Sequence, residues 1–424
     1  MKKEVGINLV AAVLLGVNAF AIENVKVNGD AKLYYYTDDK NPGDLFSKTT
    51  SAADTALRLG VSGDLAKYIS FGVTGYAIST LGLENNLVSK AWSSGHTVTN
   101  PARPNVADEA WLGEAWIAGT YGKTTLKAGR MLLDSPLSFS ETWSIAPNSY
   151  EAVVLINQDI PDTTVVGVYA GHSNGVNSVG YTDGSLPTPN NTSGNGLDGV
   201  LGDGAKFGVH GANGANVAGI INNSYKPLTA QAWYWNAVSA ADAFWLQADV
   251  DFEGLKLGAE YAEISPKGEY AGVHDSQAYA LKVGYEGIEN LKLSAAYSDV
   301  DKNSVFKVAN LATNNTVAAQ SKLYTEAFWN YGYVGAPNAK TVNLTAEYTA
   351  SIAKFGAYYT NVNNAYFATL AAPRVGVDMQ EIALSATKSF GPLDTTLAYV
   401  STDADDQNNG SQSNSLQMYL TLNF

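Results

Sequence analysis

The stretch AFWLQADVDFEGLKLGAEYAEI, residues 243–264, decides the fold. Apolar side chains stand at every second residue from Phe244 to Phe252 and again from Leu255 to Tyr261, and the charged side chains between them fall on the opposite face. A period of two is typical of β-strands, and Glu253-Gly254 between the two runs is typical of a tight turn. The stretch therefore predicts a β-hairpin with one apolar and one polar face.

The same alternation recurs along the chain as far as its last residues. Further runs begin near Tyr279, Leu291 and Val342, and the last run is Leu416 to Phe424. Several apolar faces end on tyrosine, which suits a membrane–water interface because its ring is apolar and its hydroxyl is polar. The pattern predicts strands that place one face in lipid and the other in water.

The connections between these runs alternate in length. Short turns are expected at Leu65–Tyr68, Gly119–Lys123, Asp159–Asp162, Lys226-Pro227, Glu253-Gly254, Gly287–Asn290, Ala350-Ser351 and Gly391-Pro392, with long polar stretches between them. Short periplasmic turns and long extracellular loops characterise outer-membrane barrels. Counting back from Phe424 predicts an all-β, antiparallel transmembrane barrel of eighteen strands. Sixteen is the alternative, because residues 205–225 show the weakest strand pattern.

Composition supports a membrane barrel over a soluble β-sandwich. Only 16% of the residues are charged, below the roughly 25% of soluble domains. Some eighteen strands exceed what one shared apolar core accommodates. The chain has no cysteine, which excludes disulfides, and its net charge of −14 makes nucleic acid an unexpected partner.

The N-terminus resembles a secretory signal. Lys2 and Lys3 precede an apolar run, Val10 to Val17, and Ala19-Phe20-Ala21 fits a cleavage site. We therefore expect a signal peptide at 1–21 and a barrel at 22–424, exported to the cell outer membrane. Loss of two lysines and one glutamate gives the mature chain a net charge of −15.

The polar faces of the strands are expected to line a water-filled channel, because so many strands enclose a lumen too wide for side chains to fill. By this alternation the expected pore-lining charges are Arg58, Glu114, Asp249, Asp251, Glu260, Lys282, Glu286, Glu347 and Glu381. The acidic balance predicts a preference for cations. The third long loop, Leu132 to Ser149, contains Asp134 and Glu141 and is the candidate for narrowing the pore.

Two other functions are weaker readings of the same barrel. A barrel hydrolase needs a nucleophile beside a base, and no Ser/His pair stands at adjacent strand positions, so we expect no enzyme. An adhesin or a structural barrel with a filled lumen is the other alternative. No cofactor is expected, and the one hypothesis of a metal contact is surface calcium at Asp299 and Asp301, or at Asp403 and Asp405.

Four blocks of sequence resemble a known family. Gly129 to Leu137, followed by Tyr150 to Val153 and Ile160 to Thr164, resembles the matching part of OprD-type porins. Leu323 to Tyr333 is more particularly similar to the major outer membrane porins of Campylobacter and its relatives. The resemblance implies an eighteen-stranded barrel, often a homotrimer, that passes small hydrophilic solutes with its third loop folded into the pore. Relatives of the second group also suggest cation selectivity and bound calcium.

The resemblance adds Arg130 to the expected pore residues, from a Gly-Arg-x-x-Leu pattern in which Met131 stands where glutamine is common. Alternation places Arg130 on one face with Leu126 and Ala128, so a lumen-facing Arg130 requires a bulge near Gly129. At the other end of the chain, Phe424 closes an alternating strand and resembles the signal that the barrel-assembly machinery reads. Outer-membrane lipid and lipopolysaccharide are the remaining expected partners.

Overall fold

The computed structural model describes residues 22–79, 81, 109–142, 145–173, 208–209, 214–238, 240–268, 271–311, 319–366 and 374–424. The expected signal peptide, residues 1–21, lies outside the described residues. Among those that are described, no helix is both long and apolar enough to cross a membrane.

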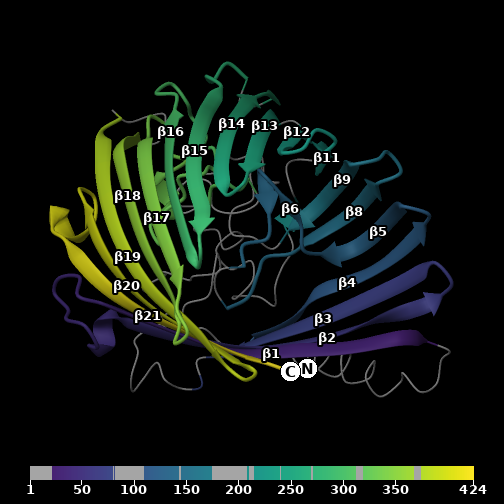
Figure 1. The fold of residues 1–424 in the computed structure, drawn as a ribbon, viewed down its shortest axis with the longest axis horizontal. Helices are drawn as coiled ribbons and strands as arrows, with labels where there is room; N and C mark the ends of the chain where they lie inside the picture. The colour runs from purple at the N-terminus through teal and green to yellow at the C-terminus, as the bar shows by residue number, and fades with distance from the viewer. Residues whose placement is uncertain are drawn as a thin grey trace.

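Eighteen strands form one closed antiparallel barrel, as the alternation predicted, and the alternative of sixteen is excluded (Figure 1). The strands of the wall are β1 (Glu23–Asp38), β2 (Ser51–Ala66), β3 (Ile69–Ser79), β4 (Glu109–Tyr121), β5 (Thr124–Met131), β8 (Tyr150–Asn157), β9 (Thr163–Ser173), β11 (Ala215–Asn222), β12 (Leu228–Ala237), β13 (Ala241–Phe252), β14 (Leu255–Pro266), β15 (Ser276–Ile288), β16 (Leu291–Val300), β17 (Lys340–Thr349), β18 (Lys354–Tyr366), β19 (Gly376–Phe390), β20 (Leu393–Ala404) and β21 (Ser413–Asn423).

The first and last strands close the barrel. β1 pairs with β21 from Asp30 opposite Asn423 to Asp38 opposite Ser415, and its other edge pairs with β2. Figure 1 shows the two strands meeting at the seam, beside the C-terminus. Each strand is therefore paired on both edges, as a sheet in lipid requires.

The two faces of the wall differ as the alternation predicted. Outward side chains such as Leu246, Leu281 and Leu344 are exposed, whereas the inward Trp245 and Glu260 are buried. Exposed aromatic side chains mark the turn end of the barrel: Tyr68, Tyr121, Tyr225, Phe252, Tyr285, Tyr348 and Phe390. These rings form the lower aromatic girdle of a membrane band.

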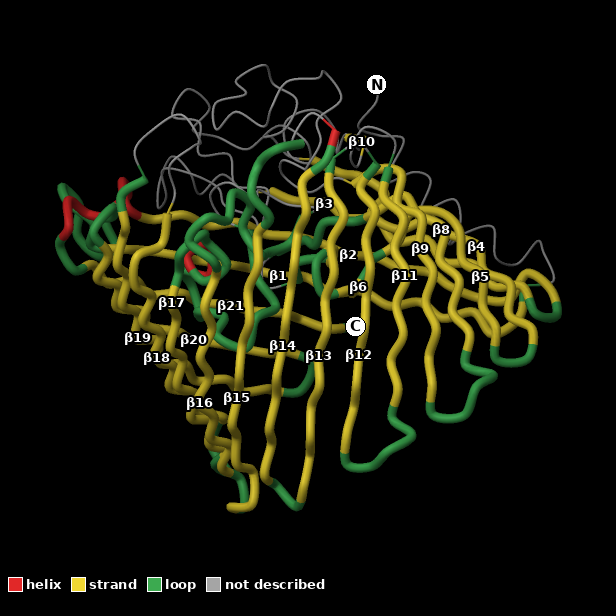
Figure 2. Tube along the Cα trace, turned by 90° about the horizontal axis from the view of Figure 1, so that it is seen from above, coloured by secondary structure: helices red, strands yellow, loops and turns green. Residues whose placement is uncertain are grey.

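All eight expected short turns join neighbouring strands at one end of the barrel, which runs along the lower and right-hand edges of Figure 2. At the other end two connections are shorter than the pattern indicated, residues 238–240 between β12 and β13 and residues 267–275 between β14 and β15. β11 lies within residues 205–225, where the sequence pattern was weakest. Its outward side chains include alanine and asparagine, which dilute the apolar period.

Two long connections fold into the interior of the barrel instead of extending outward. Residues 132–142 and 145–149, between β5 and β8, include a small hairpin, β6 (Asp134–Ser135) with β7 (Ser138–Phe139), which Figure 1 shows inside the ring of strands. Residues 301–311 and 319–339, between β16 and β17, bury Val308, Leu323 and Val334 against the inner wall. We call these two segments loop 3 and the crossing loop.

Gly129 on β5 allows a close approach to β4. Its φ is +127°, and a Cβ there would lie 2.2 Å from the carbonyl oxygen of Ala115. We expect Gly129→Ala to destabilise the barrel by on the order of 2 kcal/mol, because it adds backbone strain and a clash. Urea unfolding of the detergent-solubilised barrel measures the loss. Gly119→Ala on β4, where a Cβ meets nothing nearer than 4.0 Å, is the control. Equal midpoints for the two variants would contradict the reading.

Candidate functional site

The inner wall of β1 to β4 carries one cluster of the expected pore charges. Arg58 on β2 stands directly opposite Asp30 on β1 and forms an ion pair with it. Tyr76 on β3 is the next partner of Arg58 in the sheet, and Glu114 on β4 lies near enough to interact with the Tyr76 hydroxyl. Arg58 and Glu114 therefore face the interior on one side of the barrel.

A second cluster stands on β13 to β15 and holds the crossing loop. The hydroxyl of Tyr324 donates to Asp249 at 2.6 Å, and the backbone N–H of Tyr324 donates to Glu260 at 3.0 Å. Lys282 lies over the Tyr324 ring, 4.2 Å from its centre, where a cation is attracted by the π face. Three of the expected pore residues thus fix one residue of a loop.

Glu381 on β19 holds the same loop on another part of the wall. Its carboxylate accepts the backbone N–H groups of Trp329 at 3.0 Å and Asn330 at 2.7 Å, and the Asn330 side-chain amide at 2.7 Å. The side chain is 1% exposed, so these donors replace water around a buried charge. Residues 324–330 therefore run across the interior from β14 to β19.

The remaining expected pore charges pair with lysines close to the short turns. Asp251 pairs with Lys256, Glu286 with Lys292 at 3.5 Å, and Glu347 with Lys354 at 2.9 Å, in each case across one turn. These pairs are solvated, so each contributes little stability. They add little net charge to that end of the interior.

Loop 3 docks on the crossing loop. The Asn310 amide donates to the Phe139 carbonyl at 2.8 Å and to Glu141 at 3.1 Å, and the Leu311 N–H donates to the Leu137 carbonyl at 2.8 Å. Glu141 is buried in this contact, whereas the exposed Asp134 pairs with Lys322. Glu141 thus takes part in the contact between the two loops, and Asp134 is exposed to water.

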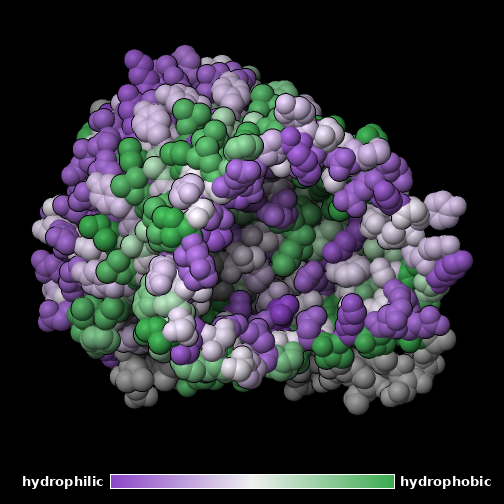
Figure 3. Space-filling model, in the orientation of Figure 1, coloured by the Kyte–Doolittle hydropathy of each residue, from purple (hydrophilic) through white to green (hydrophobic). Residues whose placement is uncertain are grey.

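A hollow of about 370 Å³ remains between the two loops and the wall near the seam. Its lining includes Lys32 and Tyr34 of β1, Thr142 of loop 3, Phe328 of the crossing loop and Tyr419 of β21. Tyr34 packs on Tyr419 with ring centres 4.6 Å apart. Along the same view as Figure 1, Figure 3 shows hydrophilic side chains around a central hollow. Among the described residues of this lining, Lys32 brings the one ammonium group.

Burial alters the charge of the crossing loop. It raises the pKa of Glu326 to about 8, an effect that the neighbouring Glu141 reinforces. It lowers the pKa of Lys307 to about 7, and the Lys307 ammonium donates to the Gly332 carbonyl at 2.8 Å. At pH 7 Glu326 is therefore mostly neutral and Lys307 only partly charged, so the loop carries less charge than its sequence indicates.

The sequence pattern missed the crossing loop as a part of the interior. Leu323 to Tyr333 stood out only as a family-like block. The available signal was the apolar content of residues 301–340, with Val308, Leu311 and Val334 in a segment without strand alternation. Apolar side chains without a period of two need some other surface to cover them.

The sequence of this chain also matches a known protein family. A sequence model of Gram-negative porins matches residues 9–324, more than half of the chain. The chain belongs to the Gram-negative porin family. A Gram-negative porin is an outer-membrane channel for small solutes and not an enzyme. No curated protein matches the chain in sequence.

Solved porins share the fold of this porin at low sequence identity. OccK8 (OprE) of Pseudomonas aeruginosa is 16% identical, with a TM-score of 0.69 over 96% of this chain and 100% of that one. OpdK of the same species, crystallised with vanillate, is 12% identical with a TM-score of 0.70, over 95% and 98%. OccAB1 of Acinetobacter baumannii is 13% identical with a TM-score of 0.70, over 96% and 97%. The closer resemblance to Campylobacter porins stays a prediction.

Arg130 does not face the interior of this porin. β5 keeps an unbroken register through Gly129 with both β4 and β8, so no bulge re-aims the side chain. Arg130 shares the outward face with the exposed Leu126, and the next residue, Met131, is buried inside. Arg130 therefore does not line the pore, although the Gly-Arg-x-x-Leu pattern placed it there. Its position agrees with the strand alternation.

Three of the four calcium candidates make other contacts. Asp405 accepts the backbone N–H of Asp378 at 3.0 Å, Asp299 lies 3.9 Å from Lys340, and Asp301 accepts the N–H of Asn303 at 2.7 Å. Within the described ranges, no three histidine, aspartate or glutamate side chains gather as a metal ion would require. The hypothesis of a surface calcium contact gains no support from these contacts.

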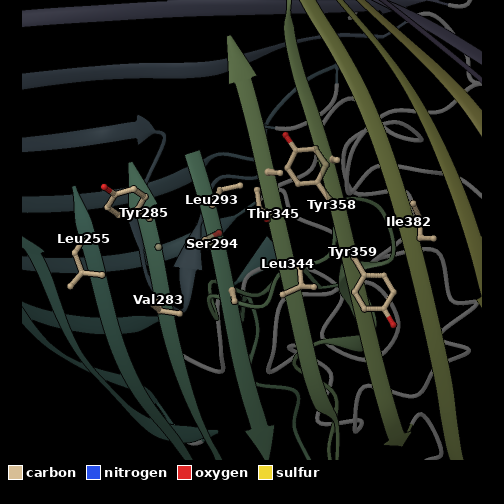
Figure 4. Close-up of a pocket in the computed structure, with 14 residues that line it drawn as sticks. Leu255, Val283, Tyr285, Leu293, Ser294, Leu344, Thr345, Tyr358, Tyr359 and Ile382 are labelled. Carbon is tan, nitrogen blue, oxygen red and sulfur yellow. The ribbon is translucent and has the colours of Figure 1, made fainter. Parts of the chain in front are cut away.

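A larger hollow, of about 630 Å³, lies on the outer surface of the wall (Figure 4). Leu255, Val283, Leu293, Leu344 and Ile382 point into it from β14 to β19. These side chains belong to the exposed, lipid-facing set. The hollow is therefore a groove in the membrane band and no part of the pore.

The contacts of Glu381 predict how firmly the crossing loop is held. Glu381→Gln puts an amide N–H₂ where the loop presents its own donors, so at least one of the three hydrogen bonds is lost. We expect chymotrypsin to cleave the folded barrel several-fold faster near Phe328 and Trp329. Glu286→Gln, at a solvated pair far from the loop, should leave cleavage unchanged. Equal resistance of Glu381→Gln and the natural protein would show that Glu381 does not anchor the loop.

Proposed function

We propose that this porin lets ions and small hydrophilic solutes diffuse passively past a narrowing formed by loop 3 and the crossing loop together. The observation that carries the proposal is the hollow of about 370 Å³ between the two loops and β1, β20 and β21. An eighteen-stranded wall alone encloses a wide lumen, so the loops limit the size of what passes.

We further propose that the channel prefers cations. Glu114 and Asp249 on the inner wall form no ion pair with any residue that the structure describes. Acidic side chains also gather at the extracellular end of the barrel: Asp39, Asp44, Asp405 and Asp406 on the connections, and Asp403 near the end of β20. A negative entrance raises the local concentration of cations and lowers that of anions.

A second candidate function is favoured by the lining of the hollow. Lys32 stands beside the rings of Tyr34, Phe328 and Tyr419, an arrangement that suits an aromatic carboxylate. OpdK was crystallised with vanillate. Under this candidate the pore selects an anionic aromatic solute, and its selectivity has the opposite sign.

The remaining proposals concern export and assembly. We propose removal of residues 1–21, a homotrimer, and contact with outer-membrane lipid and lipopolysaccharide. Phe424 is proposed as the signal read by the barrel-assembly machinery. Two observations support this role. The Phe424 side chain is exposed outward, and the Phe424 backbone pairs with Gly29 by N–H···O bonds of 2.8 and 3.0 Å.

Planar-bilayer recording of the purified porin tests the proposed function. We expect stable stepwise currents and a reversal potential of the sign for cations in a potassium chloride gradient. Thr142→Trp should lower the single-channel conductance several-fold, because the added ring enters the narrow hollow. Ser224→Trp, at an exposed periplasmic turn, is the control and should leave conductance unchanged.

The outcomes separate the candidates. A folded porin without channel activity would contradict the channel itself. An anion-selective reversal potential, with current blocked by millimolar vanillate, would favour the second candidate. Unchanged conductance in Thr142→Trp would show that loop 3 does not narrow the pore.

A further inference from the structure

Three ionisable side chains form a cluster on the outer wall, away from the pore. Arg130 of β5 donates through Nε to Glu151 of β8 at 2.9 Å, and His172 of β9 lies 3.1 Å from the other carboxylate oxygen of Glu151. Each side chain is about one third exposed or more, at 32%, 35% and 43%. Charged groups on the lipid face of a barrel are costly at the centre of the bilayer and tolerated near its interface. The energetic cost of this cluster therefore depends on its height in the membrane.

Tyrosines on other strands of the barrel mark that height. On five of the strands that rise from a periplasmic turn, an outward tyrosine stands six residues after the first strand residue: Tyr169 after Thr163, Tyr234 after Leu228, Tyr261 after Leu255, Tyr297 after Leu291 and Tyr399 after Leu393. Arg130 has this position on β5, six residues after Thr124.

The outward face becomes polar immediately above these tyrosines. Two residues further along their strands stand Asn236, Glu263, Asp299 and Ser401. The tyrosines therefore mark the upper edge of the apolar band, where lipid headgroups begin. Arg130 takes the place of a girdle tyrosine, level with the headgroups of the outer leaflet.

The surroundings of Arg130 combine an apolar floor with a charged rim. A hollow of about 490 Å³ is lined by Leu112, Ala115, Val153 and Tyr169, with Arg130, Glu151 and His172 among them. β5 ends at Met131 and β8 begins at Tyr150, so the wall stops here and loop 3 turns inward. Such a site fits an amphiphile whose acyl chain lies against the floor and whose anionic headgroup meets the rim.

Glu151 and the backbone set the direction of the guanidinium. Besides the bond from Nε to Glu151, Nη1 of Arg130 donates to the Leu112 carbonyl at 3.1 Å. An oriented guanidinium matches the geometry of a phosphate, and it stays charged at every physiological pH. We propose that Arg130, oriented by Glu151 and flanked by His172 and Tyr169, binds a phosphate group of lipopolysaccharide in the outer leaflet.

Native mass spectrometry of the delipidated porin, titrated with diphosphoryl lipid A, tests the proposal. We expect the natural porin to bind it, and Arg130→Gln to bind roughly tenfold more weakly, because a charge-assisted contact with phosphate is lost. Lys340→Gln is the matched control. Lys340 is an outward basic residue of β17 that lies 3.9 Å from Asp299, and its loss should leave lipid A binding unchanged.

Dephosphorylated lipid A on the natural porin gives a second measurement that needs no variant, and we expect little binding. Equal binding of both lipids would show that acyl chains alone occupy the hollow and would overturn the proposal. Equal lipid A binding by Arg130→Gln and the natural porin would also overturn the proposal, provided that heat-modifiable gel migration shows both proteins to be folded. The proposal would also be overturned if Arg130→Gln dissociated an oligomer and left lipid binding unchanged. That result would show that a second copy of the chain covers the cluster.

Discussion

Pairing of the first strand with the last is the constraint on which the rest of the structure depends. In lipid an unpaired N–H or C=O has no water to replace its partner, so a sheet must close on itself. β1 meets β21 over nine residue pairs, Asp30 to Asp38, and Phe424 extends the seam to Gly29. Closure fixes which face of each strand meets lipid, and so sets the inner wall, the aromatic girdles and the outward position of Arg130.

Closure at eighteen strands also creates a lumen wider than side chains can fill. The two inward loops occupy part of that space, and acids of the wall hold the crossing loop in place. Glu260 and Glu381 are 5% and 1% exposed, and both accept backbone N–H groups from the loop. Such acids provide acceptors for a loop without strand partners, and hydrogen bonding compensates the cost of burying them. They therefore position the loop, whereas Arg58 and Glu114 remain on the exposed part of the wall.

The sequence was informative wherever a local period governs the structure. The strand count, the eight turns and the facing of Asp249, Glu260 and Glu381 follow from a period of two and from turn residues. Contacts between segments far apart in the chain leave no such period. Asn310 meets Phe139 across 171 residues of sequence and Trp329 meets Glu381 across 52, so the roles of Glu141 and Glu381 as loop anchors were not predictable. At Arg130 the alternation was right and the family-like pattern was not, because an unbroken register leaves no freedom to turn one side chain.

The position of the crossing loop inside the barrel can be tested directly by an engineered cross-link. Ser298 on the inner wall and Thr325 on the loop are fully buried, with their hydroxyl oxygens 2.6 Å apart, and the natural chain has no cysteine. With cysteine at both positions, we predict a disulfide on mild oxidation of the folded barrel, with the single-channel conductance of the natural protein. A folded barrel that forms no cross-link, or one whose conductance collapses on cross-linking, would contradict the account.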